Sequence, residues 1–157
     1  DAPRPDRQLP ADAPGPIGER LGGVGILAIP IVLAEAATLA EVGVVAHRDG
    51  GRYRIALYDT DAAGQPARFL AGTILPRLAR AGENVVDIVD RPLPAGRYQL
   101  ALWSDELEIA ADASVSVPRC ARSIVIRGTE PWPARYGDAV CAGGAAPRVF
   151  IRLAPPR

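Results

Sequence analysis

The stretch Leu93-Pro-Ala-Gly-Arg-Tyr-Gln-Leu-Ala-Leu-Trp103 indicates the fold class more clearly than any other part of the chain. Pro94 and Gly96 predict a turn, because proline presets φ and glycine accepts positive φ. Behind the turn, every second residue from Tyr98 to Leu102 is large and apolar, and this period of two is typical of a half-buried strand. The stretch therefore predicts a turn that leads into a strand with one face against a core.

Runs of the same kind recur about every 10 to 15 residues along the chain, with turn residues rather than long helical patterns between them. Residues 35–41 are the exception, since they also fit a helical turn. The expected strands are 22–34, 39–47, 52–58, 68–75, 85–89, 98–103, 114–117, 123–126 and 148–153. This spacing predicts an all-β fold, an antiparallel two-sheet β-sandwich that is jelly-roll-like or immunoglobulin-like.

The apolar run 22–34 imitates a signal peptide, since Ala34-Glu35-Ala36 follows it like a cleavage site. It is preceded by acidic, proline-rich sequence instead of a basic segment, and it is too short to span a bilayer. We expect a strand that is buried on both faces, with Pro30 at a bulge or on an edge.

Residues 1–16 contain five prolines among Asp, Arg and Ala, and only Leu9 is large and apolar. Such a segment cannot bury enough surface to offset its ordering entropy. We therefore expect an extended N-terminal linker or arm at 1–20 and a β-sandwich domain at 21–157. The chain has no methionine, which predicts a mature, processed protein or an excised fragment.

The formal net charge is zero, which gives no support for nucleic-acid binding. All eighteen basic residues are arginine, so Schiff-base lysines and the lysine of a phosphate-binding loop are excluded. No segment is expected to span a membrane. A protein partner or self-assembly is the expected interaction, with a glycan as the alternative.

Cys120 and Cys141 enclose a loop of about twenty residues. A disulfide between them would stabilise the fold by about 3 kcal/mol through the restricted unfolded chain. Two buried thiols are the alternative. An even cysteine count in a chain that lacks its start favours a secreted or cell-envelope protein.

No cofactor or metal is expected from the sequence. Two cysteines and one distant histidine do not make a zinc site. Asp59 and Asp61 begin a possible calcium loop, but the fifth position is Ala63 and the twelfth is Leu70, so the EF-hand pattern fails. Asx turns in a hairpin loop explain both aspartates.

The candidates for catalysis are few. His47 is the only histidine, and no nucleophile motif surrounds any serine that it could activate. Asp105, Glu106 and Glu108 have the residue types of a glycoside-hydrolysing carboxylate pair, but closely spaced acids after a strand are usually a solvated loop. We therefore expect that the protein is not an enzyme.

Trp132 lies between two prolines and near Tyr136, where a rigid exposed indole could stack on a sugar or anchor a protein partner. The alternative is that it closes one end of the sandwich. Trp103 belongs to the face of its strand opposite to Tyr98, so it is the third candidate contact. The face that carries Trp103 and Gln99 must be covered by solvent, a loop or another subunit.

Several stretches together resemble a β-sandwich accessory module that occurs in secreted bacterial surface proteins and phage virion proteins. The resemblance covers about residues 24–153. The stretches that carry it are Pro30-Ile-Val-Leu-Ala-Glu-Ala-Ala-Thr-Leu-Ala-Glu-Val-Gly43, Tyr53-Arg-Ile-Ala-Leu-Tyr-Asp59, Gly64-Gln-Pro66, Leu93-Pro-Ala-Gly-Arg-Tyr-Gln-Leu-Ala-Leu102, and Pro131-Trp-Pro133 with Tyr136. The resemblance implies a non-catalytic accessory domain. The chain departs from the module at Gln99, where an aromatic residue is common, and in its cysteine pair.

These observations lead to one expected function, a structural or protein-interaction domain of an exported cell-surface or extracellular assembly. The alternative is a carbohydrate-binding module that uses exposed aromatics.

Overall fold

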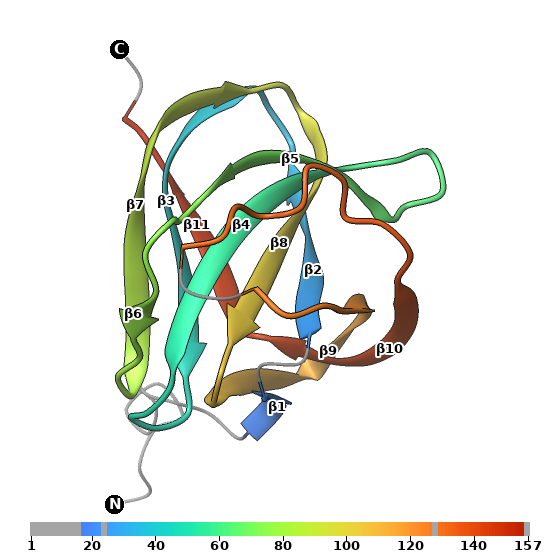
Figure 1. Ribbon diagram of the computed structural model, residues 1–157. Helices are drawn as coiled ribbons and strands as arrows, with labels where there is room; N and C mark the ends of the chain where they lie inside the picture. The colour runs from blue at the N-terminus through green and yellow to red at the C-terminus, as the bar shows by residue number, and fades with distance from the viewer. Residues whose placement is uncertain (1–16, 23–24, 127–128, 156–157) are drawn as a thin grey trace, which may run out of the picture.

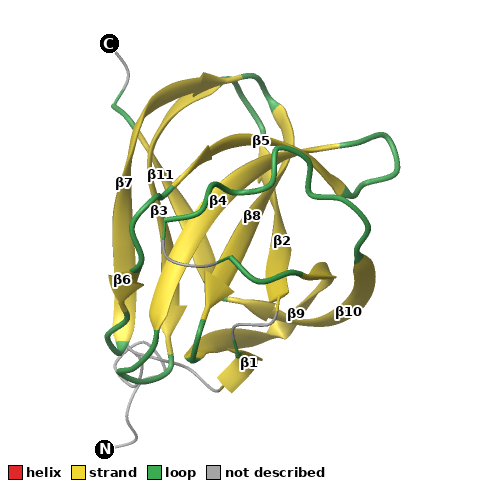
Figure 2. Ribbon diagram, in the orientation of Figure 1, coloured by secondary structure: helices red, strands yellow, loops and turns green. Residues whose placement is uncertain are grey.

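The computed structural model describes residues 17–22, 25–126 and 129–155. Within these ranges every regular element is a β-strand, and every strand pairing is antiparallel (Figure 2). The prediction of an antiparallel all-β fold is confirmed. The strands are β1 (Ile17–Leu21), β2 (Gly25–Leu33), β3 (Ala37–Ala46), β4 (Arg52–Thr60), β5 (Pro66–Gly72), β6 (Arg77–Leu78), β7 (Gly82–Leu93), β8 (Gly96–Ser104), β9 (Leu107–Ser123), β10 (Val140–Pro147) and β11 (Val149–Leu153).

The strands that the structure describes form one hydrogen-bonded network of eleven, with the order β11-β3-β9-β2-β8-β4-β5. β7 pairs with β3, β1 and β10 pair with β9, and β6 pairs with β4. Strand β9 is seventeen residues long and links two groups, since it meets β3 near its start and β2 near its end (Figure 1). The pairings therefore do not separate into two sheets, and the two-sheet sandwich stays a prediction.

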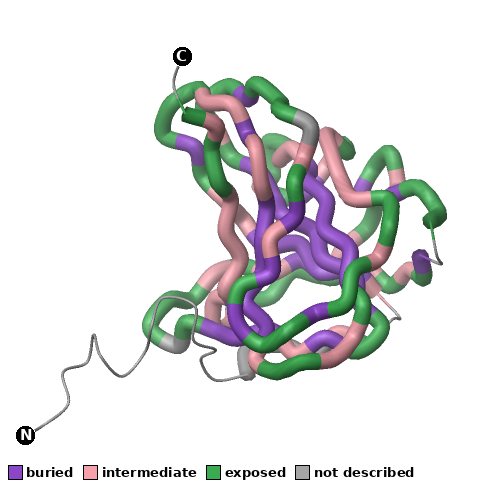
Figure 3. Tube along the Cα trace, turned by 90° about the vertical axis from the view of Figure 1, so that its left-hand side faces the viewer, coloured by how far each residue is buried: buried purple, intermediate pink, exposed green. Residues whose placement is uncertain are grey.

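The main core lies between the two groups of strands (Figure 3). Strands β2, β4 and β8 contribute alternate side chains, as the pleat requires, and strands β3, β7 and β9 contribute the opposing ones. Its buried members are Leu27, Ile29, Leu33, Leu39, Val42, Val44, Ala46, Tyr53, Ile55, Leu57, Ala79, Val86, Leu93, Tyr98, Leu100, Leu102, Leu107 and Ile109. The alternation within residues 93–103 thus places Tyr98, Leu100 and Leu102 in the core, as predicted.

The opposite face of β2, β4 and β8 carries a second buried cluster. Its members are Ile26, Ala28, Ala56, Tyr58, Ala101, Trp103, Cys120, Ile126, Trp132 and Tyr136. The chain between β9 and β10 crosses this face in front of β4 and β8 (Figure 1), and it supplies Trp132 and Tyr136. The central strands are therefore buried on both sides. The chain between β9 and β10, called the covering loop below, covers the face of β8 that carries Gln99 and Trp103, for which the sequence predicted solvent, a loop or another subunit.

Strand β2 is buried on both faces, as expected, only in its first half. Ile26, Leu27, Ala28 and Ile29 are all buried, whereas Val32 is 68% exposed. Its pairing with β9 ends at Ala28, while its pairing with β8 continues to Leu33. Pro30 consequently stands where β2 has one neighbouring strand, which is an edge position that proline tolerates.

Several boundaries differ from the prediction. The strands expected at 114–117 and 123–126 are parts of, or follow, the single strand β9, and residues 140–147 form β10, which was not expected. Residues 35–41 hold no helical turn, because β3 begins at Ala37. Residues 17–20, assigned to the arm, belong to β1, which pairs with β9. The rest of the arm, 1–16, lies outside the described residues.

Candidate functional site

A disulfide joins Cys120 of β9 to Cys141 of β10, with an S–S distance of 2.02 Å. The two residues are direct cross-strand partners in the β9–β10 register. Cys120 is buried in the second cluster, whereas Cys141 is exposed. The predicted disulfide is therefore present, and the alternative of two buried thiols is wrong.

The three aromatic candidates are buried. The exposed fraction is 9% for Trp103, 6% for Trp132 and 0% for Tyr136. The Trp132 indole N–H donates to the carbonyl oxygen of Thr73 at 3.1 Å, and the Arg54 guanidinium carbon lies 5.3 Å from the centre of the indole. One ring face and the polar edge of Trp132 are thus already in use, so these residues do not form the exposed aromatic platform that the carbohydrate-binding alternative requires.

Tyr136 and Tyr58 hold the covering loop in place. The Tyr136 hydroxyl donates to the carbonyl oxygen of Cys120 at 2.7 Å, with the carbonyl oxygen of Ile26 at 3.1 Å. The Tyr58 hydroxyl donates to the carbonyl oxygen of Pro133 at 2.6 Å, and the two phenol rings meet edge to face at 5.3 Å. Burial raises the pKa of both phenols well above the ordinary value, against the lowering effect of Arg122.

Arg54 is a fully buried cation behind Trp132, with 1% of its surface exposed. Its Nε and Nη2 atoms donate to the carbonyl oxygen of Thr73 at 3.2 and 3.0 Å. Burial lowers the pKa of the guanidinium, while the nearby carboxylate of Glu130 raises it. Thr73 is thereby a fixed point, because its amide and hydroxyl also bond to the main chain of Ile55.

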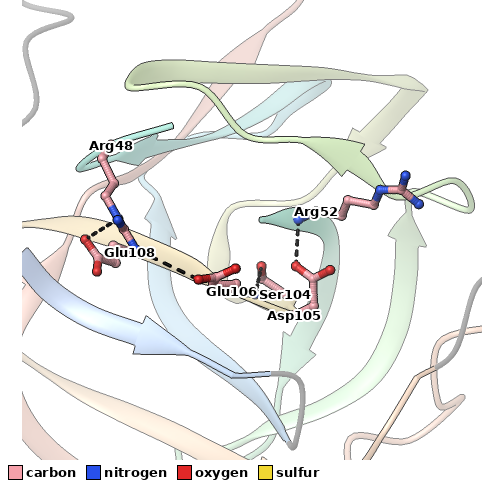
Figure 4. Close-up of polar contacts among 6 residues, drawn as sticks. All are labelled: Arg48, Arg52, Ser104, Asp105, Glu106 and Glu108. Atoms are coloured by element: carbon pink, nitrogen blue, oxygen red, sulfur yellow. Dashed lines mark hydrogen bonds and ion pairs between the residues drawn. The ribbon is translucent and has the colours of Figure 1, made fainter. Parts of the chain in front are cut away.

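The acids proposed for hydrolysis lie together with His47 where the β3–β4 and β8–β9 turns meet. Arg48 pairs with Glu108 at 3.0 Å and lies 4.0 Å from Glu106 (Figure 4). The His47 amide donates to the carbonyl oxygen of Glu108 at 2.7 Å. Asp105 Oδ1 accepts the Arg52 amide at 2.7 Å, and the Arg52 side chain points away from it (Figure 4).

The contacts in this cluster are those of a turn junction. Ser104 is fully buried, and its hydroxyl oxygen accepts the amide of Glu106 at 3.1 Å. Gly51 has a φ of +82°, and a Cβ added there would lie 2.3 Å from the carbonyl oxygen of Glu106. The two turns are therefore in close main-chain contact, and the acids brace that contact through Arg48 and the Arg52 amide.

The Asp59–Asp61 loop is also explained by hydrogen bonding. Asp61 Oδ1 accepts the amides of Ala63 and Gln65 at 2.9 Å each, which is an Asx turn. Asp59 pairs with Arg68 at 3.0 Å. In the part of the chain that the structure describes, no group of three His, Cys, Asp or Glu side chains is arranged to hold a metal ion.

A groove of about 990 Å³ lies between β5, β7 and the covering loop. Its walls are mostly apolar, with charged groups from β4 and β7. The lining residues are Arg54, Phe69, Leu70, Ala71, Gly72, Thr73, Ile74, Asp87, Ile88, Asp90, Arg91, Pro92, Pro131, Trp132 and Ala134. The sequence did not indicate this groove, because its three walls are separated by up to sixty residues and each wall alone has an ordinary strand or loop pattern.

A ridge of aliphatic side chains lies beside the groove, and we define it as residues 74–78. Ile74, Leu75 and Leu78 are 66%, 67% and 63% exposed. The ridge is held at both ends, by Thr73 as described and by Ala79, which is buried and exchanges main-chain hydrogen bonds with Gly50 and Gly51. The ridge is therefore an exposed apolar segment whose position is fixed at both ends.

Comparison with protein-family models, with curated proteins and with solved structures gives no match for this chain. Within the described ranges, no helix is long and apolar enough to cross a membrane.

Proposed function

We propose that the chain is a non-catalytic protein-interaction domain that binds its partner at the groove between β5 and β7. The observation that carries this proposal is the groove itself, a preformed apolar depression continuous with the exposed ridge. Interfaces between proteins are built around such apolar centres with a polar rim. Here Asp87, Asp90 and Arg91 supply the polar groups around the apolar lining.

A protein partner fits the groove better than a sugar. Sugar binding in such modules depends on the open face of an aromatic ring. The Trp132 ring is covered by Arg54 on one face, and its N–H is bonded to Thr73. The remaining walls come largely from aliphatic residues such as Leu70 and Ile88.

The polar clusters support a non-catalytic role. The carboxylates of Asp105 and Glu108 are committed to Arg52 and Arg48, and the Ser104 hydroxyl is buried at the turn junction. A general base needs access to the proton that it removes, and these groups are instead used to hold two turns together.

We further propose that the strand groups β7-β3-β11 and β2-β8-β4-β5 are the two packed sheets of a β-sandwich, linked by β9 and of the kind found in secreted surface modules. Support comes from the main core, to which both groups contribute facing side chains. The disulfide supports an exported, secreted or cell-envelope location, since disulfides persist in oxidising compartments.

The test is a selection of displayed random peptides on the immobilised protein at low surface density. Ala134 lines the groove and is exposed, so Ala134→Arg obstructs the groove without disturbing the core. Ala142→Arg makes the same change at an exposed position of β10 outside the groove. We expect selected peptides to bind the wild type and Ala142→Arg alike and to lose at least tenfold in affinity for Ala134→Arg. Selected peptides that bind Ala134→Arg as tightly as the wild type would contradict the proposal. A protein that binds glycans but selects no peptides would contradict it as well.

A further inference from the structure

We infer that the partner at this surface is a second copy of the same chain, with the ridge of each copy seated in the groove of the other. The inference rests on the proposed function, because it uses the same groove. Ile74 belongs to both features: it lines the groove and is the first residue of the ridge. A protruding and a hollow apolar surface that lie side by side become complementary to themselves under a twofold rotation.

Two carboxylates in the groove are opposite in charge to the arginines of the ridge, while the groove's own Arg91 is bonded to the carbonyl oxygen of Leu70. Asp87 and Asp90 line the groove, and neither carboxylate has a hydrogen bond or ion pair with any other residue in the described ranges. Arg77 on the ridge and Arg80 just after it are exposed, and neither guanidinium has a carboxylate partner among those residues. Among the other exposed arginines of the described ranges, Arg152 is paired with Glu41 and Glu83, whereas Arg97 and Arg135 are not paired with a carboxylate.

A twofold contact brings these groups together across the interface. When the ridge of one copy enters the groove of the other, Arg77 of the first copy faces Asp87 and Asp90 of the second, and the symmetric contact occurs at the same time. Ion pairs across an interface fix its register and select the correct partner. This patch therefore holds both halves of the pairing that it needs.

Both halves are also preformed. The ridge is fixed at Thr73 and Ala79. The walls of the groove are tied together by Arg91, whose Nη1 donates to the carbonyl oxygen of Leu70 at 2.7 Å, from β7 to β5. Little conformational entropy is lost on association when the contact surfaces are already rigid.

Other occupants fit less well. An anionic bilayer would be attracted by Arg77 and Arg80 but repelled by Asp87 and Asp90, which border the same apolar surface. A strongly basic or acidic peptide meets one favourable and one unfavourable pair of charges. Only a partner that presents the same mixture in the opposite arrangement satisfies both, and a second copy does so by symmetry.

The experiment is sedimentation equilibrium on the whole chain from about 0.1 to about 100 μM protein, with three variants. Leu75 is on the ridge but does not line the groove, so Leu75→Ser weakens the contact alone. Burial of a leucine side chain accounts for about tenfold or more in affinity, and the contact occurs twice, so the dimer dissociation constant should rise by about 100-fold. The matched control is Val140→Ser, at a 78% exposed position on β10, which should leave the constant unchanged.

Charge reversal tests the geometry. One variant carries Arg77→Glu, and a second carries Asp87→Arg together with Asp90→Arg. Each variant alone should remain monomeric, because like charges meet at both contacts. An equimolar mixture of the two should form a heterodimer, since each contact again joins opposite charges. Circular dichroism of each variant alone, unchanged from the wild type, shows that the loss of self-association is not a loss of folding.

The outcomes separate the two proposals. A wild type that stays monomeric over the whole range overturns the second-copy inference, and so does a dimer that is insensitive to Leu75→Ser or one that the charge-reversed mixture fails to restore. If peptides sensitive to Ala134→Arg are nevertheless selected, the groove remains an interaction site for another protein. If neither self-association nor such peptides are found, both proposals fail.

Discussion

Removal of one hydroxyl group measures how strongly the covering loop is fastened to the central strands. Tyr136 is completely buried, and its hydroxyl donates to the carbonyl oxygen of Cys120 at 2.7 Å. The carbonyl oxygen of Ile26 lies 3.1 Å from the same hydroxyl. In Tyr136→Phe these main-chain groups keep their burial and lose their partner, which costs more than an exposed hydrogen bond would. We expect the free energy of unfolding to fall by about 2 kcal/mol, within a range of about 1 to 3 kcal/mol.

The assay is unfolding in guanidinium chloride with the disulfide intact, followed by tryptophan fluorescence. The denaturant midpoint should fall while the slope m stays constant, since the surface exposed on unfolding is unchanged. Tyr53→Phe is the matched control: Tyr53 is also buried, and its hydroxyl has no hydrogen-bond partner among the described residues. It should change the stability by less than about 0.5 kcal/mol. Equal effects of the two substitutions would refute the reasoning, because the hydroxyl of Tyr136 would then contribute nothing to the attachment of the loop.

Three further predictions follow from the same contacts. Replacement of Cys120 and Cys141 together by alanine should lower the free energy of unfolding by about 3 kcal/mol, as measured by denaturant unfolding, because the unfolded chain gains the freedom of a closed loop with a sequence separation of 21. An effect below about 1 kcal/mol would contradict this. Gly51→Ala should cost about 3 kcal/mol by thermal unfolding, against about 1 kcal/mol for Gly64→Ala, which has the same φ in open space; equal costs would remove the proposed contact between the turns. Above about pH 10 the wild type should lose up to about 1.4 kcal/mol per pH unit more than Tyr58→Phe, because the unfolded phenol releases its proton while burial raises the pKa of the folded one. Parallel pH profiles for the two proteins would argue against this.

The strands with clear alternation were predictable from the sequence. The turn at Gly96 and the strand behind it are present, and Gly96 has the positive φ, +151°, that the turn requires. The alternation of Tyr98 to Leu102 reports a local preference that the core then uses. For such segments, local pattern and tertiary packing agree.

The long strand β9 was not predictable in the same way. Polar and apolar residues alternate only over 114–117, which predicted a short piece of β9, and Pro118 suggests a break after it. Both faces of the strand are exposed around Ser114 and Ser116, so no buried face marks its full length. In this part β9 pairs only with β10, whose small residues also give no period of two. Hydrogen bonding and the disulfide define these strands, and neither leaves a pattern in hydrophobicity.

The aromatic candidates show a different limit. Trp132 and Tyr136 were identified as the notable aromatics of their loop, but whether such side chains face solvent depends on what lies beneath them. Beneath them is the second face of β4 and β8, with Ala56 and Ala101. Small residues there leave room for a large aromatic side chain from elsewhere in the chain, and a single sequence does not show that the two surfaces meet.

Because the aromatic side chains are buried in the cover, the proposed binding surface rests on exposed aliphatic residues instead. Val32 and Val140 are exposed in isolation on separate strands, which is normal for a folded domain. Ile74, Leu75 and Leu78 are exposed together, on a segment fixed at both ends and beside the groove. Trp132 connects the two parts of the molecule, since its indole packs in the second cluster, lines the groove and bonds to Thr73 at the base of the ridge. The cover that stabilises the fold thus also shapes the surface proposed to bind a partner, so weakening of its attachment should weaken binding even where no groove residue is changed.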